Sequence, residues 1–583
     1  MTGNYKIHGV NGPVVTVSGK TALSMNEMVF VGEKRLLAEV IRVDEKKAII
    51  QVYEETGGLR PGEPVEPTGA PMSIALGPGL LSGIFDGVAN PLKVIAEKSG
   101  AFIPAGIQAE SLGDKLWDVT LRVKKGDKVS PGQIFAECSE TGAIVHKSMI
   151  PPDVSGVVES VKPDGSYTVN EVLCVVTDDR LNEHEIRLQH RWPIKKPRPV
   201  ARRLSLTKPL VTGQRVVDTF FPIAKGGAAA IPGGFGTGKT MMQHQLAKWC
   251  DADIIIYIGC GERGNEMTNA LAEFSELIDP KTGRPLMDRT VLIANTSNMP
   301  VAAREASIYT GITMAEYYRD MGYNVAMMAD STSRWAEAMR EISGRLEEMP
   351  ADEGFPAYLP SRLSEFYERA GCTENLNGTE GSVSVIGAVS PQGADFSEPV
   401  TQNTKRFTRC FWALDKSLAY ARHYPAINWN DSYSEYVGDL SDWYSSEVGE
   451  DFMACRTELF SILAAETGLM EIVKLIGSDV LPDDQKLTIE TARVIRVGFL
   501  QQNAFHKDDT YVEPLKQLKM MRVILYLHHK CRDIIARQIP ISEILKKGLF
   551  DKLVQMKYDI PNTRLEKFDE YYRLIDASLS ELS

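Results

Sequence analysis

The residues best suited to chemistry stand at positions 233–240, where the chain reads GGFGTGKT. They match the phosphate-binding pattern G-x-x-x-x-G-K-[ST], with Gly233, Gly238, Lys239 and Thr240 at the fixed positions. Glycines let backbone N–H groups turn inward and approach phosphate oxygens closely. Lys239 would reach the β- and γ-phosphates as a positive charge, and Thr240 would offer its hydroxyl to Mg²⁺. The pattern therefore predicts a site for a nucleoside triphosphate.

The neighbouring segments suit such a loop. Residues 228–231 are a short apolar run that predicts a strand, and residues 241–249 predict a helix. The N-terminus of that helix would then point at the phosphates. The alternative is a glycine turn before a helix, with a lysine that contacts no ligand.

Two acids stand at predicted strand ends. Asp330 closes the apolar run 324–330, and Glu262 follows the apolar run 253–258. Ligands of open α/β sheets lie at the carboxyl ends of strands, so Asp330 suits Mg²⁺ and Glu262 suits the attacking water. The alternatives are a helix N-cap for Asp330 and a solvated loop acid for Glu262. Arg263, Arg304 and Arg334 are candidates for charge compensation, and their spacing does not rank them.

Residues 200–440 alternate strands with helices. The runs 253–258, 290–294 and 324–330 are almost wholly apolar, and helical stretches such as 302–321 separate them. Strands that are apolar on both faces indicate a parallel sheet covered by helices.

Two other segments are rich in β signals. Residues 1–72 combine short strands with closely spaced turns, the pattern of a small β-barrel. Between 113 and 190, residues 122–132 predict strand–turn–strand and residues 156–165 predict a hairpin. The first stretch looks like part of a lipoyl- or biotinyl-carrier fold. Lys147 stands in no clear acceptor tripeptide, so we interpret the segment as structural.

Residues 191–199 are basic and proline-rich, which predicts a rigid linker rather than a nucleic-acid contact. From 441 to 583, apolar residues recur at three- and four-residue spacing in the stretches 452–465, 487–500, 515–535 and 565–579. That period predicts a helical domain.

The bulk composition is that of a large globular protein. A chain of 583 residues is too long to fold around one hydrophobic core. Its net charge of −12 argues against a general nucleic-acid binder. No apolar run is long enough for a membrane span, and the first residues do not form a signal peptide. The eight cysteines are scattered and include no C-x-x-C pair. This pattern favours reduced thiols in a cytoplasm over a set of disulfides or a zinc site.

Taken together, these motifs resemble one family over essentially the whole chain, the catalytic A subunits of V-type and A-type rotary ATPases in a form of prokaryotic length. The resemblance rests on residues 76–81, 233–240, 259–266, 295–306, 329–335 and 425–434. It implies a multidomain α/β fold with an N-terminal β-barrel at 1–72 and a P-loop (RecA-like) nucleotide-binding core at 73–440. It also implies an inserted β-rich bulge domain at 113–190 and a C-terminal helical bundle at 441–583.

The resemblance also assigns site residues. It implies ATP and Mg²⁺ as ligands, and it gives catalytic roles to Lys239, Glu262 and Arg263, which sets Arg263 above Arg304 and Arg334. Thr240 and Asp330 would hold the metal. The nucleotide would be bound by Gly233, Gly234, Phe235, Gly236, Thr237, Gly238, Lys239, Thr240, Met241, Tyr424 and Phe505, the two aromatic residues Tyr424 and Phe505 holding adenine. Residues 476–484 resemble the acidic loop that pushes the rotating stalk.

The implied assembly is a hexamer of three A and three B subunits with central and peripheral stalks. It would be cytoplasmic, peripheral to the membrane and linked to an ion-translocating sector for protons or sodium. An arginine finger would come from the neighbouring B subunit, and no nucleic acid is implied. Two departures stand out: Gly234 replaces a common proline, and Thr237 replaces the cysteine of eukaryotic relatives, so redox control through that thiol is in doubt.

Two other classes remain as alternatives. One is a different hexameric ATPase for protein export or RNA translocation; such proteins are typically shorter and lack the 113–190 insert. The other is a regulatory ring subunit that binds nucleotide without turnover, against which the intact Lys239, Thr240 and Glu262 argue.

Overall fold

The computed structural model describes residues 5–18, 22–100, 103–107, 109, 112–478 and 480–582. It divides into two compact units, and each is described separately. Unit 1 comprises Met1–Ser205, Gly226–Ala228 and Ala252–Thr408, and unit 2 comprises Leu206–Lys225, Ala229–Asp251 and Arg409–Ser583. Every helix in the described residues is too short or too polar to span a membrane.

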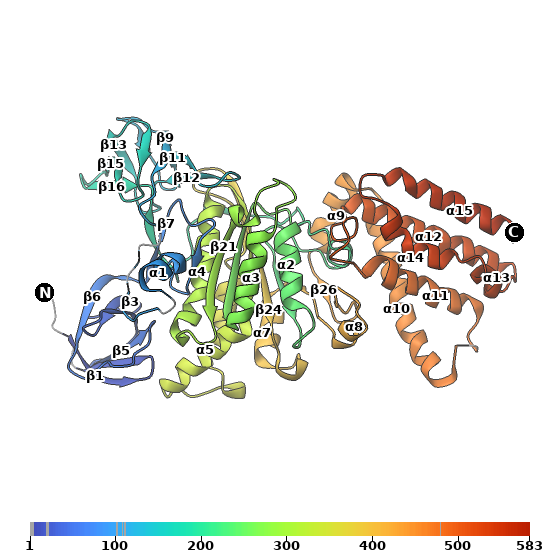
Figure 1. The fold of residues 1–583 in the computed structure, drawn as a ribbon, viewed down its shortest axis with the longest axis horizontal. Helices are drawn as coiled ribbons and strands as arrows, with labels where there is room; N and C mark the ends of the chain where they lie inside the picture. The colour runs from blue at the N-terminus through green and yellow to red at the C-terminus, as the bar shows by residue number, and fades with distance from the viewer. Residues whose placement is uncertain are drawn as a thin grey trace. The chain divides into compact units, whose positions relative to one another are not determined.

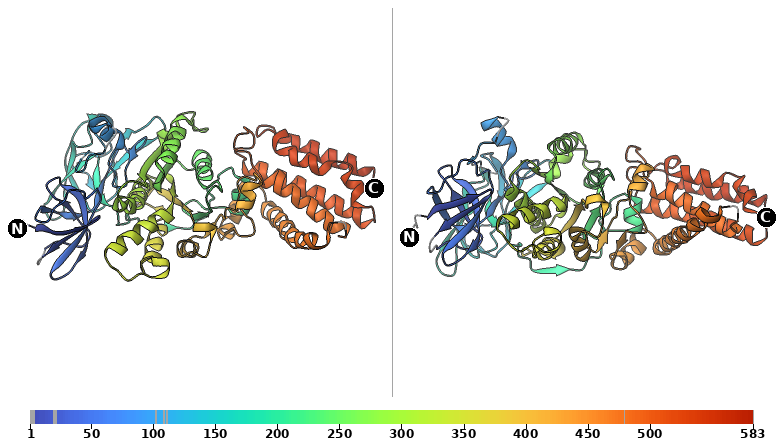
Figure 2. Two further views of the ribbon diagram at one scale, coloured as in Figure 1. Left: turned by 60° about the horizontal axis from the view of Figure 1, so that its bottom comes forward. Right: turned by 90° about the horizontal axis from the view of Figure 1, so that it is seen from below.

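Unit 1 begins with a closed six-stranded barrel of strand order β1-β2-β5-β4-β3-β6, visible in dark blue in Figure 2. Its strands are β1 (Tyr5–Asn11), β2 (Val14–Ser18), β3 (Glu27–Val31), β4 (Leu36–Val43), β5 (Lys47–Val52) and β6 (Pro64–Pro71). Burial alternates along β3, where Val29 and Val31 face the core with no exposed surface. This period of two is the sign of a sheet with one packed face, and the predicted barrel is confirmed.

The insert forms two four-stranded sheets, of order β10-β13-β15-β16 and β12-β11-β9-β14 (Figure 1). The strands are β9 (Trp117–Leu121), β10 (Lys128–Val129), β11 (Ile134–Ser139), β12 (Val145–Met149), β13 (Gly156–Val161), β14 (Gly165–Tyr167), β15 (Val172–Thr177) and β16 (Glu183–Arg187). The hairpin predicted at 156–165 is wrong, because β13 pairs with β10 and β15 while β14 pairs with β9. The predicted strand–turn–strand at 122–132 is likewise split: β9 ends at Leu121, and β10 pairs in the other sheet.

A carboxylate fastens the insert to the segment that enters the sheet of unit 1. Glu140 accepts hydrogen bonds from the backbone N–H groups of Gly79 at 2.8 Å and Leu81 at 3.0 Å. The hydroxyl of Tyr318 donates to the same carboxylate at 2.9 Å. A two-stranded antiparallel sheet of β7 (Ser73–Leu76) and β17 (His190–Pro193) joins the two ends of the insert.

The nucleotide-domain part of unit 1 is a parallel sheet of order β24-β22-β20-β21-β8, with antiparallel β23 beside β24 and β18 beside β23. The strands are β8 (Ile84–Phe85), β18 (Arg202–Leu204), β20 (Ile254–Glu262), β21 (Thr290–Thr296), β22 (Asn324–Asp330), β23 (Gly371–Glu374) and β24 (Glu380–Val389). Its helices are α1 (Leu92–Ser99), α3 (Gly264–Glu276), α4 (Val301–Asp320), α5 (Thr332–Arg345), α6 (Leu359–Tyr367) and α7 (Pro399–Phe407), with short 3₁₀ turns η2 (Leu286–Arg289), η3 (Asp352–Gly354) and η4 (Gln392–Ala394). Helix α4 is buried along nearly its whole length. The predicted parallel sheet is confirmed.

Unit 2 holds β19 (Ala228–Pro232), which pairs in parallel with β25 (Cys410–Phe411), and antiparallel β26 (Tyr433–Ser434) beside β25. The remaining elements are helices α2 (Lys239–Trp249), α8 (Lys416–Tyr420), α9 (Val437–Glu447), α10 (Phe452–Ile476), α11 (Asp483–Arg493), α12 (Pro514–Ala536), α13 (Ile541–Leu545), α14 (Leu549–Asp559) and α15 (Phe568–Ser580), the π-helical segments η1 (Val216–Phe220) and η5 (Val494–Leu500), and a 3₁₀ turn η6 (Leu565–Lys567).

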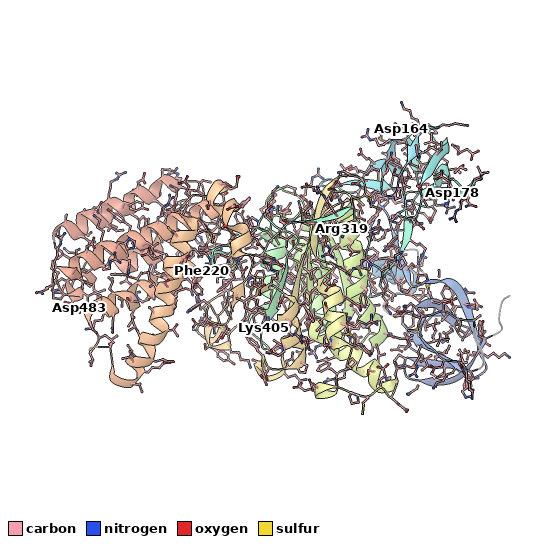
Figure 3. The ribbon with its side chains drawn as sticks, turned by 180° about the vertical axis from the view of Figure 1, so that it is seen from behind. Asp164, Asp178, Phe220, Arg319, Lys405 and Asp483 are labelled. Atoms are coloured by element: carbon pink, nitrogen blue, oxygen red, sulfur yellow. The ribbon has the colours of Figure 1, made fainter. Side chains whose placement is uncertain are left out.

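An aromatic cluster gives unit 2 its core. Phe220, labelled in Figure 3, ends η1, and its ring lies edge-on to that of Phe460 in α10 at 5.6 Å between centroids. The ring of Phe499 in η5 is tilted against that of Phe220, with 6.3 Å between centroids. The predicted helical C-terminal domain is confirmed. Of the acidic loop predicted at 476–484, Asp479 lies outside the described residues, and Asp483 starts α11.

Candidate functional site

The loop between β19 and α2 has the conformation that its glycines predict. Gly236 and Gly238 adopt φ values of +79° and +89°, which disfavour residues with side chains. The Thr237 hydroxyl donates to the Gly234 carbonyl at 2.8 Å and braces the turn. Lys239 donates from its ammonium group to the carbonyls of Gly233 at 2.7 Å and Gly234 at 3.0 Å.

Helix α2 begins directly after this loop. The predicted helix at 241–249 is confirmed, and it starts two residues earlier, at Lys239, with Gly238 as its N-cap. The first N–H groups of an α-helix have no carbonyl in their own helix to bond, and the helix dipole favours negative charge there. Loop, lysine and helix end together can hold phosphate oxygens.

A cavity of about 830 Å³ lies beside the loop, entirely within unit 2. Five predicted positions are among its walls, Thr237, Gly238, Met241, Tyr424 and Phe505. Its size is that of sites for cofactors and other small ligands. The full set is Gln214, Thr237, Gly238, Met241, Met242, Gln245, Leu414, Arg422, Tyr424, Pro425, Ala426, Gln501, Gln502, Asn503, Ala504, Phe505 and Tyr558.

Two aromatic side chains in this wall are unusually exposed. Phe505 is 90% exposed and Tyr424 is 43% exposed. A methyl group built on Gly238 would lie 3.5 Å from the Tyr424 ring, so this ring stands against the glycine loop. Exposed aromatic rings beside a phosphate-binding loop can stack on a planar base.

The chain segment that carries Phe505 is held by a buried ion pair. Arg215 and Asp509 are both fully buried and paired. Arg215 also donates to the carbonyls of Phe499 and, at 2.9 Å, of Gln501. Asp509 accepts the backbone N–H of Asn503 at 2.7 Å. These bonds fix both ends of the segment, so Phe505 stands on a rigid base.

The second set of predicted residues lies in unit 1, where β20 and β22 end. The strands are neighbours, with Gly259 opposite Asp330, so Glu262 and Asp330 stand at the same edge of the sheet. Asp330 is 2% exposed and accepts the Tyr257 hydroxyl at 3.3 Å. Burial, followed by the charge of Asp330 and a hydrogen bond with Glu266, raises the pKa of Glu262 to about 9. Carboxyl groups that repel one another in this way attract a cation.

The arginines are distributed around Glu262. Arg334 opposes the upward shift of the Glu262 pKa, and it pairs with Glu337 at 2.8 Å. Gly261 has φ of +71°, and a methyl group there would meet Arg334 at 2.8 Å and Arg304 at 3.0 Å. Arg263 is the N-cap of α3. Arg334 is thus one arginine whose charge acts on Glu262, a role that spacing alone did not identify.

Magnesium is predicted to bind through few protein groups. In the described part of the chain, no group of three or more His, Cys, Asp and Glu side chains is arranged to hold a metal ion. Mg²⁺ commonly uses one or two protein ligands and completes its shell with water and substrate phosphates. The predicted ligands, Thr240 in unit 2 and Asp330 in unit 1, each carry oxygen donors of the type that Mg²⁺ prefers.

Several alternatives can be compared with the structure. Ser331, not Asp330, is the N-cap of α5, so the helix-cap interpretation of Asp330 is wrong. Lys147 donates to the Met321 carbonyl at 3.1 Å and lies over the Tyr323 ring, which gives it a structural role. No disulfide joins any of the eight cysteines, and seven of them are buried while Cys372 is partly exposed.

Sequence reasoning missed several cavity residues. Arg422 and Tyr558 line the cavity, as do the residues at 501–503. Tyr558 belongs to α14 and is brought to the cavity by the packing of the helical domain. Its only sequence signal is an aromatic residue near a helix end, which is too common to identify a site.

Comparisons with known proteins match four segments of the chain to one family. The nucleotide-binding domain of the ATP synthase alpha/beta family matches residues 213–434, and the beta-barrel domain of that family matches residues 7–69. The alpha/beta subunit barrel-sandwich domain matches residues 110–195. The C-terminal domain of V and A type ATP synthase matches residues 441–545.

Curated relatives extend over nearly the full length. The V-type ATP synthase alpha chain of Halothermothrix orenii is 60% identical over 575 residues, with 98% of each chain covered. The A-type ATP synthase A subunit of Methanopyrus kandleri is 55% identical over 577 residues, covering 98% of this chain and 97% of that one. Among solved structures, the type III secretion ATPase EscN of enteropathogenic E. coli has a TM-score of 0.63 at 20% identity and covers 89% of this chain and 99% of that one. At that identity the likeness concerns the fold alone.

Proposed function

Because the chain belongs to the family of V-type ATP synthase alpha chains and A-type ATP synthase A subunits, we propose residue roles for ATP turnover on that basis. The chain is a catalytic subunit of a rotary ATPase that couples ATP hydrolysis or synthesis to ion transport. It is part of a multi-subunit, membrane-associated complex. The proposal is carried by one observation, the cavity that places Tyr424 and Phe505 beside the glycine loop.

ATP would lie with its phosphates on residues 233–241 and its base in the cavity. Lys239 would leave the carbonyls of Gly233 and Gly234 and turn to the β- and γ-phosphates, where its charge is better compensated. Tyr424 and Phe505 would hold adenine by stacking. The amides at the start of α2 would add fixed positive potential.

Thr240 and Asp330 would hold Mg²⁺. The ion, when bound, supplies positive charge that offsets the charge of the phosphate oxygens and of Asp330. The charge of Asp330 is one cause of the raised pKa of Glu262, so its neutralisation would lower that pKa. Glu262 would then be ionised and able to accept a hydrogen bond from the attacking water.

Glu262 would orient that water for in-line attack on the γ-phosphate. Arg263 is the predicted catalytic arginine, while Arg334 would favour the ionised form of Glu262 between turnovers. In a regulatory ring subunit, which binds nucleotide without turnover, Glu262 would have no such role. Replacing Glu262 should therefore reduce turnover if the chain is a catalytic subunit and leave turnover unchanged if it is a regulatory one.

The partners follow from the same proposal. We propose a hexamer of three A and three B subunits, cytoplasmic and peripheral to the membrane, with central and peripheral stalks and no nucleic acid. An arginine from the B subunit would complete each catalytic site, as arginine fingers do elsewhere with rate gains of roughly 10³ to 10⁵. The isolated chain should therefore be a poor ATPase.

The test is Mg-ATPase activity of the chain alone and after mixing with its B subunit, with the mass of each species measured in parallel. Activity that appears only with the mixed hexamer supports the proposal. Full activity from a homohexamer of this chain alone would instead favour the export-ATPase class, whose fold the chain shares. Stimulation by RNA would favour a helicase.

A further inference from the structure

A second cavity, of about 360 Å³, lies wholly within unit 1, and neither Glu262 nor Asp330 belongs to its walls. It is bounded by the linker 195–203, residues 309–319 of α4, the end of α6 with the turn after it, and the start of β23. Arg319, labelled in Figure 3, belongs to this wall at the end of α4. The linker follows the inserted domain, so the cavity lies where the insert rejoins the nucleotide domain.

Three guanidinium groups are buried in this wall. Arg198 and Arg319 are each 3% exposed, and Arg369 is 5% exposed. Buried arginines require matching negative charge, because an uncompensated charge in a protein interior is strongly unfavourable. Two buried carboxylates, Glu316 and Asp320, supply part of that negative charge.

Glu316 is committed to one arginine. Its two oxygens accept from the Arg369 guanidinium, at 2.9 Å from Nε and 2.6 Å from Nη2. The backbone N–H of Arg198 donates to it at 3.0 Å. Asp320 is shared by the other two arginines, accepting from Nε of Arg198 at 2.6 Å and from Nη2 of Arg319 at 2.7 Å. Three buried cations therefore face two buried anions.

The other groups around Arg198 do not balance the third charge. Its Nη1 lies 2.9 Å from Nε2 of His190, and burial together with the charge of Arg198 lowers the pKa of that imidazole, which keeps it neutral. The rings of Trp192 and Tyr317 lie against the Arg198 guanidinium at 5.1 and 5.3 Å, and they attract a cation without neutralising it.

The rim of the cavity adds one more cation. Arg203 is exposed, and its guanidinium donates to the backbone carbonyls of Glu368 and, at 3.5 Å, of Ala370. Two carboxylates also stand at the rim. Glu365 pairs with Arg362 at 3.2 Å, while Glu368 accepts the Ser364 hydroxyl at 2.9 Å and keeps its negative charge, which offsets that of Arg203. Lys195 is paired with Glu39 at 2.6 Å.

We propose that this cavity binds a small oxyanion of the phosphate class, held by Arg198, Arg203 and Arg319. Planar guanidinium groups match the oxygens of phosphate in bidentate geometry. The anion would add negative charge beside the three buried arginines, which face two buried carboxylates, and would tie the linker to α4. Its source is either free phosphate or the phosphate of a small monoester, which share this chemistry.

The test measures the unfolding temperature of the full chain in phosphate, in phenyl phosphate and in chloride at matched ionic strength. All proteins carry Lys239→Ala, which removes the principal cation of the glycine loop. This background weakens anion binding at the glycine loop, so that stabilisation by phosphate reports on the second cavity and does not depend on the proposed function. The test variant adds Arg203→Ala, and the exposed position of Arg203 means that its loss should not impair folding. The control adds Arg202→Ala, the adjacent exposed arginine, which pairs with Glu374 and does not line the cavity.

Phosphate or its monoester should raise the unfolding temperature by about 2 °C or more in the background and in the Arg202→Ala control. The Arg203→Ala variant should lose at least half of that rise. Crystals soaked in tungstate should show anomalous density among the three arginines. Equal stabilisation of all three proteins, or no tungstate there, would overturn the proposal. Tungstate density without any stabilisation by phosphate would mean an adventitious ion only, and would also overturn it.

Discussion

Lys239 lies over its own loop, with its ammonium nitrogen 2.7 Å from the carbonyl oxygen of Gly233. In the proposed mechanism, the side chain exchanges that carbonyl for phosphate oxygens when a nucleotide binds. Substituting Lys239→Ala should lower turnover of the assembled complex by about 10²–10³-fold, the typical effect of removing one charge-stabilising donor. Steady-state ATPase measurements check this. Lys248→Ala, at the other end of α2, is the control and should retain near-parental activity.

Glu262→Gln should reduce turnover by about 10²–10⁴-fold and leave nucleotide binding intact, because the amide cannot accept the proton or orient water as a carboxylate does. Turnover of the reconstituted hexamer and ADP binding to it are measured together. Glu276→Gln, an exposed acid at the end of α3, is the matched control. Unchanged turnover in Glu262→Gln would show that another group positions the water.

Tyr424→Ala and Phe505→Ala should each weaken ADP binding about 5- to 150-fold, since stacking of a base on an aromatic ring contributes roughly 1–3 kcal/mol. Tyr424→Phe and Phe505→Tyr should retain near-normal affinity, because the apolar face is kept. Tyr420→Ala serves as control, since Tyr420 is 85% exposed and lies outside the cavity. Affinity is measured by calorimetry with ADP. A loss in the Tyr420 variant equal to that in the others would argue against stacking.

Asp509→Asn should destabilise the chain by about 3–5 kcal/mol, because Arg215 would keep a fully buried charge without its partner. The segment that carries Phe505 should loosen with it, so ADP affinity should fall as well. Urea unfolding and ADP calorimetry on the same protein check both effects. Lys507→Ala, exposed on the same segment, should change neither. Lost stability with unchanged affinity would mean that Phe505 is held by other contacts.

Glu140 gives a pH dependence of known sign. Burial raises the pKa of this carboxyl from 4.5 to about 7. Between these values the folded chain binds the proton more tightly than the unfolded chain, so the stability that Glu140 contributes is full at low pH and falls as the pH rises to 7. The loss is about 3 kcal/mol over that window.

The variant Glu140→Gln tests this sign. Its amide oxygen can still accept from Gly79 and Leu81, but it does not ionise. Relative to the parent, the variant should gain stability in urea unfolding as the pH rises from about 5 to about 8. A constant difference between the two proteins over that range would contradict the buried carboxylate. Glu137→Gln is the control, because Glu137 is partly exposed and lies on β11, which ends one residue before Glu140.

The sequence predicts where strands lie better than it predicts which strands pair with one another. The apolar runs that became β20, β21 and β22 were identifiable because strands buried on both faces carry no polar alternation. The hairpin at 156–165 was wrong because alternation marks a strand without saying which strand it joins, and β13 and β14 joined different sheets.

The site shows the same limit. Lys239 and Thr240 were identifiable because local spacing along one loop fixes their geometry. The effect of Arg334 on Glu262 and the place of Tyr558 in the cavity depend on contacts between distant segments. No local pattern carries that information, so these residues required the structure.

The partly exposed thiol of Cys372 offers a spectroscopic handle that the chain already contains. Thiols react as thiolates, and burial raises the pKa of Cys138, Cys174, Cys260 and Cys531 to about 12. Cys372 stands between Gly371 and Thr373, which both line the cationic cavity. A fluorophore attached to this sulfur would stand on the strand that carries two residues of the cavity wall, so a change in its emission on addition of phosphate would be a second test of the proposed oxyanion site.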